Sequence, residues 1–296
     1  MITPLKPDGG LDEPAAERIV ERIAASGAGV FTSGTTGESA SLPADLSHRL
    51  VQIATGVAAR RVPVLAGIGG NCVAGSLAAA DAYFRLGVDA VVAHVASYYL
   101  LEPPAMQAYF ELLARNLPGP LVLYNIPQAT RMSLPVETVE RLAELPSVIG
   151  FKDSENVPGR LEQVAARLGG RPRFSIFMGA SVLSTQALRR GFDGLVPGSG
   201  NLAPALWCRL YAAAGEGRWE EAEKLQKTAD ALARIFQQGR PLGQSLAALK
   251  AMMEARGLCG PTVLSPLLTL PPAERAAIRA ELAALDPDAA VVPAAP

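Results

Sequence analysis

Short apolar runs alternate with longer amphipathic segments from Met1 to Asn201 of this 296-residue chain. Several runs are rich in Val and Ile and apolar throughout, which is typical of parallel strands buried on both faces. The expected strands are Met1–Thr3, Gly29–Thr32, Val62–Ile68, Ala90–Val95, Leu121–Asn125, Val148–Lys152, Phe174–Met178 and Gly194–Pro197. Eight strand–helix units predict an α/β fold, a closed (β/α)8 TIM barrel. A doubly wound open sheet is the main alternative, but it usually has fewer strands and a nucleotide-binding loop after the first.

Segments with apolar residues at helical spacing separate these runs. The expected helices are Glu13–Ala25, Ala44–Ala58, Ala74–Leu86, Pro104–Arg115, Val136–Leu145, Pro158–Leu168 and Val182–Arg190. After Asn201 only helical patterns follow, at Pro204–Glu216, Glu220–Gln238, Leu242–Arg256 and Pro272–Ala284. The sequence therefore predicts a catalytic barrel domain over 1–215, a C-terminal helical domain over 216–288 and a disordered tail over 289–296.

Composition excludes several classes of partner. The net charge is -1, with acidic and basic residues interspersed, which gives no basis for binding nucleic acid or an anionic membrane. No apolar run approaches the roughly 18 residues of a membrane helix, and the first residues lack the pattern of a signal peptide. Cys72, Cys208 and Cys259 are far apart and odd in number, which favours buried thiols over disulfides or a zinc site. We expect a cytoplasmic protein.

Lys152 is the leading candidate for chemistry. In a barrel of this kind the functional side chains follow the carboxyl ends of the strands, and Lys152 is the only lysine at any of these ends. Low-dielectric surroundings disfavour the ammonium form and leave neutral amine that can attack a carbonyl. A lysine paired with Asp153, or one extending to solvent, is an equally good interpretation of this position alone.

Three other features lie at strand ends. Tyr124 ends the preceding strand at the same level, so its hydroxyl could move protons at Lys152 or at a bound carbonyl; a core tyrosine is the alternative. The GTTG turn at 34–37 offers hydroxyls and backbone N–H groups as a carboxylate cradle at the start of the next helix, although such turns are common. His94 could act as an acid/base group or ligand, but a lone strand histidine is more often structural.

In combination and in order, these motifs resemble the dihydrodipicolinate synthase / N-acetylneuraminate lyase family of class I Schiff-base lyases. The resemblance covers essentially the whole chain and rests on Gly34-Thr35-Thr36-Gly37-Glu38, Tyr98-Tyr99, Tyr124-Asn125-Ile126-Pro127, Lys152-Asp153 and Gly257-Leu258 with Pro266-Leu267. It implies an enzyme, a carbon–carbon or carbon–oxygen lyase, that acts on pyruvate and related 2-oxo acids without metal or organic cofactor. It also implies a homo-oligomer, a tetramer built as a dimer of dimers.

The resemblance assigns a role to each matching residue. Lys152 matches the Schiff-base lysine, and Tyr124 matches the proton-transfer tyrosine, which Thr35 holds by a hydrogen bond. Tyr99 matches the tyrosine that completes this relay, in many members from a neighbouring subunit. The matching substrate-binding positions are Thr36 and Gly34 for the carboxylate, Gly179 after strand seven, and Val196, whose backbone carbonyl faces the pyruvyl group.

Departures from the family pattern bear on the substrate. In dihydrodipicolinate synthases an arginine two residues after the YNxP proline binds the carboxylate of the aldehyde, and here that position is Ala129. Sialic-acid lyases carry an acidic pair after the strand-seven glycine, where this chain has Ser181 and Val182. Arg131 replaces a usual glycine and is expected to point to solvent. The family also has more residues before Thr3, so either the natural start lies upstream or strand one is unusually short.

We therefore expect aldol cleavage or condensation of a 2-keto-3-deoxy sugar acid or a similar 4-hydroxy-2-oxo acid. Three alternatives stay open: 4-hydroxy-tetrahydrodipicolinate synthase activity, dehydration of a keto-deoxy sugar acid, and a non-catalytic metabolite-binding protein on the same scaffold.

Overall fold

The computed structural model describes residues 1–285, and the chain divides into two compact units. One unit combines residues 1–64 with the chain from Gly198 onward, and the other is Leu65–Pro197. The predicted boundary between residues 215 and 216 stays a prediction. The predicted tail, 289–296, lies outside the described residues.

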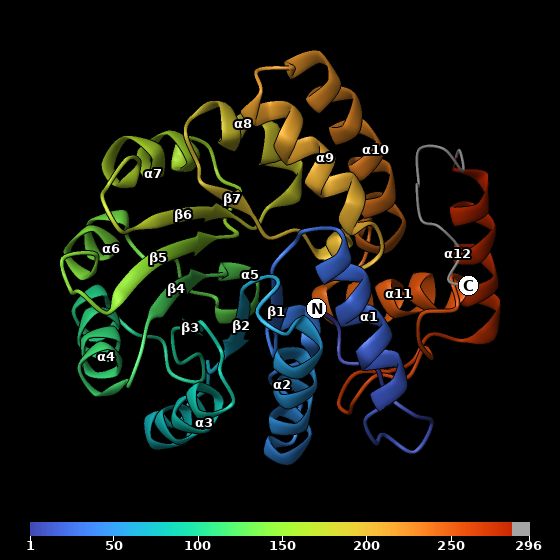
Figure 1. The fold of residues 1–296 in the computed structure, drawn as a ribbon, viewed down its shortest axis with the longest axis horizontal. Helices are drawn as coiled ribbons and strands as arrows, with labels where there is room; N and C mark the ends of the chain where they lie inside the picture. The colour runs from blue at the N-terminus through green and yellow to red at the C-terminus, as the bar shows by residue number, and fades with distance from the viewer. Residues whose placement is uncertain (286–296) are drawn as a thin grey trace. The chain divides into compact units, whose positions relative to one another are not determined.

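Strands β2 to β7 pair in chain order, and every pair is parallel (Figure 1). They are β2 (Val64–Gly67), β3 (Ala90–His94), β4 (Leu121–Asn125), β5 (Val148–Asp153), β6 (Ser175–Met178) and β7 (Gly194–Leu195). Because parallel neighbours need a crossover connection, a helix lies between consecutive strands. This order is the one that the repeated strand–helix pattern predicts.

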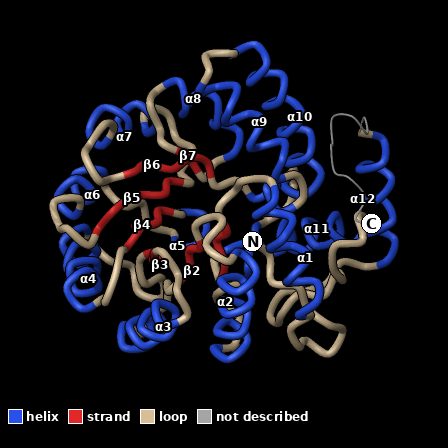
Figure 2. Tube along the Cα trace, in the orientation of Figure 1, coloured by secondary structure: helices blue, strands red, loops and turns tan. Residues whose placement is uncertain are grey.

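The crossover helices cover one face of these strands (Figure 2). They are α3 (Val73–Arg85), α4 (Pro103–Asn116), α6 (Val136–Leu142), α7 (Arg160–Leu168) and α8 (Ser184–Arg189), with a 3-10 turn η2 (Ser181–Leu183) before α8. The short helix α5 (Pro127–Thr130) follows β4 and does not lie in this outer layer (Figure 1). In α4, Met106, Phe110 and Leu113 recur at helical spacing and are buried, which is why one side of the helix packs inward.

Register places the strand side chains in rows. His94 pairs with Tyr124, and Tyr124 pairs with Lys152, so these three side chains leave the sheet on the same face. The row before them leaves on the opposite face and is fully buried: Ala93, Leu123 and Phe151. Alternation along each strand thus separates a face of packing residues from a face that carries polar groups.

The other unit contains one strand and the remaining helices. Its elements are α1 (Glu13–Ala25), β1 (Val30–Thr32), η1 (Thr35–Gly37), α2 (Ala44–Ala58), η3 (Gly198–Asn201), α9 (Pro204–Gly215), α10 (Trp219–Gln237), α11 (Leu242–Ala255) and α12 (Pro272–Ala284). Helix α1 packs against α2 and α9, and α10 packs against α9, α11 and α12. From residue 202 to 285 the described chain contains helices and no strand, as predicted for the C-terminal extension.

The prediction of a strand at Met1–Thr3 is wrong: residues 1–285 contain seven strands, and none lies there. The segment is buried, and its amino terminus donates to the Phe31 carbonyl of β1, but Ile2 and Thr3 bond to partners outside the strands. The Ile2 N–H donates to Asn201 Oδ1 at 2.7 Å, and the Thr3 hydroxyl donates to the Gly37 carbonyl at 2.6 Å. The Ile2 N–H, which a ladder would use as a donor, is already bonded to a side chain, so no ladder forms here.

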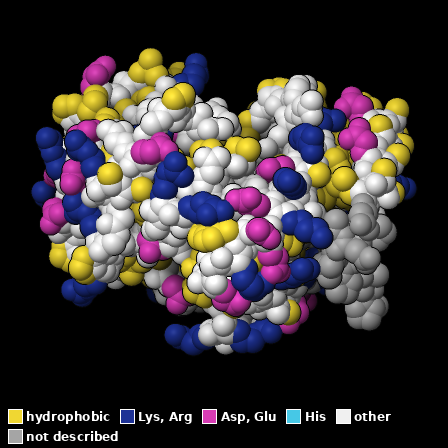
Figure 3. All heavy atoms as spheres, turned by 90° about the horizontal axis from the view of Figure 1, so that it is seen from above, with side chains coloured by type: hydrophobic (Ala, Val, Ile, Leu, Met, Phe, Trp, Pro, Cys, Tyr) yellow, Lys and Arg dark blue, Asp and Glu magenta, His cyan; other side chains and the backbone are white. Residues whose placement is uncertain are grey.

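Charges are mixed on the surface. On the face that Figure 3 shows, basic and acidic side chains are interspersed over the described residues, in keeping with the net charge of -1. No helix within residues 1–285 is both long enough and apolar enough to span a bilayer.

A buried ion pair follows the GTTG turn. Lys250 Nζ on α11 lies 2.5 Å from Glu38 Oε1, and each side chain is 1% exposed. The ammonium also donates to the Thr262 carbonyl at 2.5 Å, while Glu38 Oε2 accepts from the Leu264 N–H at 2.7 Å. Burial lowers the pKa of Lys250, and Glu38 opposes that change. The pair therefore ties the end of η1 to α11 and to the loop that follows it.

Removing one charge of this pair should destabilise the protein more than removing both. Lys250→Met leaves the Glu38 carboxylate buried without its cation, and we expect the free energy of unfolding to fall by about 3–5 kcal/mol. The double variant Glu38→Gln/Lys250→Met should recover part of that loss. Urea unfolding of the three proteins measures both effects, and a double variant less stable than Lys250→Met would contradict this view of the pair.

Candidate active site

Lys152 and Tyr124 form the centre of the candidate site. They lie on neighbouring strands β5 and β4, and their side chains are 8% and 4% exposed. Lys152 Nζ lies 3.9 Å from the centroid of the Tyr124 ring, so the nitrogen sits over the aromatic face. An amine in this position is shielded from bulk water and leans toward β4. The structure thus brings together the two residues that the sequence placed at the same level.

An irregularity in the β4–β5 pairing produces this contact. Leu121 pairs with Val148, but Val122 pairs with Gly150, so Ile149 is an additional residue in β5. Without it, Tyr124 would pair with Phe151, whose side chain leaves the sheet on the opposite face. A one-residue slip would turn every side chain of a strand to the opposite face. The bulge therefore places Tyr124 and Lys152 on the same face of the sheet.

Gly179 borders Lys152 from the end of β6. A Cβ at this position would overlap the Ser154 hydroxyl oxygen and lie 3.0 Å from Lys152 Cε. The Gly179 N–H donates to the Asp153 carbonyl at 2.7 Å, which holds the backbone at this close approach. Ser154 follows Lys152 by two residues and so shares its face. The sequence placed Ser154 at a strand end but assigned it no role, although that period-two spacing pointed to one.

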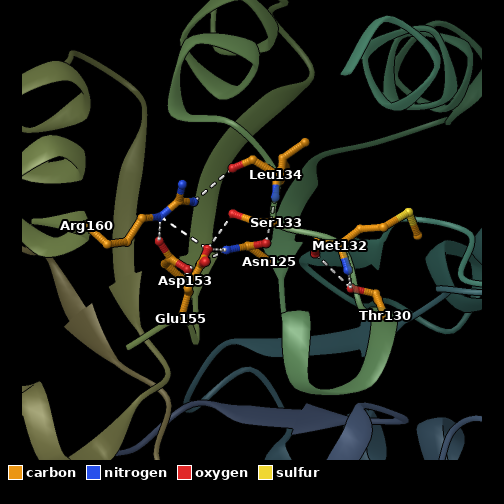
Figure 4. A network of polar contacts seen from close by, with 8 residues as sticks. All are labelled: Asn125, Thr130, Met132, Ser133, Leu134, Asp153, Glu155 and Arg160. Carbon is orange, nitrogen blue, oxygen red and sulfur yellow. Dashed lines mark hydrogen bonds and ion pairs between the residues drawn. The ribbon is translucent and has the colours of Figure 1, made fainter. Parts of the chain in front are cut away.

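The residues next to Tyr124 and Lys152 face the other way, into a polar network (Figure 4). The Asn125 amide donates to Asp153 Oδ1 and to Glu155 Oε2, each at 2.8 Å, and its oxygen accepts from the Leu134 N–H at 2.9 Å. Arg160 of α7 donates to Asp153 Oδ2 at 2.7 Å and to the Leu134 carbonyl at 2.9 Å. The network joins the ends of both strands to α7 and to the segment before α6.

Buried charge makes this network sensitive to change. Asp153 is 1% exposed and Arg160 is 8% exposed. Burial raises the pKa of the Asp153 carboxyl, while the Arg160 guanidinium and the Asn125 amide lower it. The Arg160 guanidinium carbon also lies 5.9 Å from the centroid of the Phe151 ring. Sequence analysis considered Asp153 only as a possible partner of Lys152; instead, Asp153 pairs with Arg160.

The other predicted site residues occupy different environments. Val196 follows β7, where its N–H donates to the Met178 carbonyl at 2.8 Å. Tyr99 is 73% exposed and packs edge-to-face on Tyr98, which is 78% exposed, so it is not buried beside Lys152 in its own chain. Among residues 1–285, no group of three or more His, Cys, Asp or Glu side chains is arranged to hold a metal ion.

Gly34, Thr35 and Thr36 lie in the other compact unit, so their assignment to the site stays a prediction. Gly34 precedes the 3-10 turn that holds both threonines, and all three are half-buried. The turn does not open the next helix as predicted, since α2 begins only at Ala44. Gly34 is required locally because a Cβ there would lie 2.9 Å from the Phe31 ring.

A methyl group at Gly179 should displace the two side chains that it would meet. We expect Gly179→Ala to slow capture of a 2-oxo acid by Lys152 at least about tenfold, since the nucleophile must move from its position. The stability should change little, because the obstructing atoms belong to side chains. The matched control is Gly56→Ala on the exposed side of α2, where a Cβ meets nothing within 4 Å. Equal capture rates for both variants would disprove the close packing.

Comparisons with known proteins agree with this geometry. The profile of the dihydrodipicolinate synthetase family matches residues 1–285. A 4-hydroxy-tetrahydrodipicolinate synthase of Hyphomonas neptunium is 33% identical over 286 residues, covering 96% of this chain and 95% of the relative.

Two solved structures share the fold over nearly their whole length. Dihydrodipicolinate synthase from Bacteroides thetaiotaomicron has a TM-score of 0.88 at 32% identity, and YagE from E. coli, solved with pyruvate, has 0.89 at 26% identity. Each comparison covers 96% of both chains. The predicted (β/α)8 barrel with a helical C-terminal part is therefore confirmed, and so is the predicted class of enzyme. The chain belongs to the dihydrodipicolinate synthetase family, whose members are class I Schiff-base lyases.

Proposed function

We propose that this enzyme captures pyruvate or a related 2-oxo acid as a Schiff base on Lys152 and makes or breaks a carbon–carbon bond at C3. The contact between Lys152 and Tyr124 carries the proposal. A nearly buried lysine beside a tyrosine places an amine that can attack a carbonyl next to a hydroxyl that can move protons. The pyruvate bound in the YagE structure supports the same class of substrate.

The chemistry assigns work to each group. The Lys152 amine attacks the C2 carbonyl, and the carbinolamine loses water to give an iminium ion, for which Tyr124 supplies and removes protons. In cleavage, the C3–C4 bond breaks as the C4 hydroxyl loses its proton, and the electron pair passes to the iminium to form an enamine. Protonation at C3 and hydrolysis release pyruvate and restore the amine. In our proposal Thr35 and Tyr99 complete the proton relay.

We propose that the GTTG turn at 34–37 binds the carboxylate of the substrate. Thr36, Gly34 and nearby backbone N–H groups hold the substrate carboxylate, while Gly179 and the Val196 carbonyl border the pyruvyl group. The family pattern supports these roles. They need no metal ion or organic cofactor, because the lysine-derived iminium is itself the electron acceptor.

The second half of the substrate is, in our proposal, a hydroxylated aldehyde, so that the full substrate is a 2-keto-3-deoxy sugar acid. Ala129 stands where family synthases place a carboxylate-binding arginine. Arg131 is exposed at the end of α5 with a positive φ of 58°, and Thr130 is held by its own backbone contacts. The segment around Ala129 therefore presents no inward guanidinium for a second carboxylate.

The second candidate is 4-hydroxy-tetrahydrodipicolinate synthase, which condenses pyruvate with aspartate semialdehyde. Two relatives that are 4-hydroxy-tetrahydrodipicolinate synthases, 33% and 30% identical to this chain, favour it. Both candidates share the Schiff base on Lys152 and differ only in the aldehyde. Dehydration of a keto-deoxy sugar acid would release no pyruvate, so product analysis separates it from cleavage.

An oligomer is part of this proposal. Tyr98, Tyr99 and Leu100 form a consecutive aromatic and aliphatic segment, each residue more than 70% exposed. Such a segment is costly to leave in water and suits contact with a second copy of the chain. We propose a homo-oligomer, a dimer of dimers, in which Tyr99 reaches the neighbouring subunit's site, in a cytoplasmic enzyme.

Borohydride trapping tests the proposed Schiff base. Reduction in the presence of pyruvate should leave a stable adduct on the Lys152 peptide, seen by mass spectrometry, because borohydride reduces the iminium. Lys152→Ala should give no adduct, whereas Lys224→Ala, which removes an exposed lysine on α10, should retain it. A folded wild-type protein without adduct, with pyruvate and with keto-deoxy sugar acids, would refute the proposal.

A comparison of substrates separates the two candidates. We expect pyruvate release from a 2-keto-3-deoxy sugar acid to exceed condensation with aspartate semialdehyde in kcat/KM, because no guanidinium binds the semialdehyde carboxylate. Ala129→Arg should raise the condensation by about 10- to 100-fold, the value of a charged hydrogen bond. The control is Gln128→Arg at the adjacent exposed position. Wild-type condensation faster than cleavage would establish the synthase instead.

A further inference from the structure

His94 lies in the same row of side chains as Tyr124 and Lys152, and it has no role in the proposed reaction. It ends β3, pairs with Tyr124 and so lies two strands from Lys152. With neighbouring strands roughly 4.8 Å apart, a substrate of five or six carbons attached to Lys152 is long enough to span that separation. Lys152 Nζ already leans over the Tyr124 ring, toward β3. The imidazole therefore lies within reach of the distal part of a bound chain.

One hydrogen bond determines which ring nitrogen faces a ligand. His94 Nδ1 lies 2.8 Å from the Val95 carbonyl oxygen, and since a carbonyl only accepts, Nδ1 carries the proton. Burial lowers the pKa of His94, which favours the neutral ring. Nε2 then holds a lone pair. Among residues 1–285, the ring has no other hydrogen bond, and His94 is half-buried.

Packing holds the ring in place. A Cβ at Gly69 would lie 2.5 Å from His94 Nε2 and would overlap the adjacent ring carbon, so the ring rests directly on the glycine backbone after β2. The Tyr109 hydroxyl donates to the His94 carbonyl at 3.2 Å and anchors the end of the strand. The ring is thus held in one position before any ligand arrives.

We propose that His94 is a specificity-determining residue that accepts, at Nε2, a hydrogen bond from a hydroxyl on the aldehyde-derived half of the substrate. The inference rests on the proposed function of Lys152 and defines its substrate as a hydroxylated 2-oxo acid. The acceptor requires a donor, and a hydroxyl fits better than an ammonium group. The row from β3 to β6 contains His94, Tyr124, Lys152 and Phe177 and thus no carboxylate to pair with a cation.

Two substitutions test the assignment. His94→Phe keeps a ring against Gly69 but removes the acceptor, and we expect kcat/KM for 2-keto-3-deoxy sugar acids to fall about tenfold or more, mostly through KM. His94→Gln restores an acceptor and should recover part of the loss. Borohydride trapping of pyruvate on Lys152 should stay unchanged in both, because pyruvate lacks the distal hydroxyl. His48→Gln, which changes the only other histidine at an exposed site, is the control.

Each outcome decides the inference. Loss on hydroxylated substrates with unchanged pyruvate trapping supports it. Unchanged cleavage of the sugar acids by His94→Phe overturns it while leaving the Schiff base intact. A loss seen only in condensation with aspartate semialdehyde assigns the acceptor to an ammonium group and overturns the hydroxyl assignment. Absence of trapping in the wild-type protein removes the proposed function and this inference with it.

Discussion

The extra residue Ile149 in β5 is the constraint on which the candidate site depends. It shifts the pairing between Leu121 and Val122 so that Tyr124, and not the residue after it, shares a face with Lys152. Gly150 follows the bulge, and a Cβ there would lie 2.8 Å from the Ser175 carbonyl of β6, so the strand stays close on that side as well. Because strand side chains alternate, a shift of one residue in register would place Tyr124 and Lys152 on opposite faces of the sheet.

At their carboxyl ends, strands β4 and β5 carry polar side chains on both faces of the sheet. On one, Lys152 and Tyr124 stand side by side; on the other, Asp153 and Asn125 enter a buried network completed by Arg160. Lys152 and Tyr124 therefore each precede a residue that is held by hydrogen bonds on the opposite face of the sheet. Hydrogen bonds that hold the backbone on this second face also help to fix the directions of the Lys152 and Tyr124 side chains on the first.

Much of this arrangement follows from local patterns. The strand and helix segments agree with the sequence analysis to within a few residues, since apolar periodicity is a local property. The strand predicted at Met1–Thr3 is absent because Ile2 and Thr3 bond to Asn201 and Gly37, and the periodicity of a sequence does not reveal such partners. Ser154 was given no role, although strand alternation places it on the face of Lys152. Arg160 was missed because its partners lie on other elements, separated from it along the chain by at least five residues.

The sequence by itself determined the alternation of strands and helices, the single lysine at a strand end, the tyrosine before it and the absence of an arginine at Ala129. These are properties of residue type and spacing, and they suffice to indicate the class of chemistry. Tertiary structure alone decided that the β5 bulge aligns Tyr124 with Lys152, that Gly179 lies close to that lysine and that the His94 ring rests on Gly69. Each of these depends on the approach of backbones distant in sequence, and such distances are set by packing.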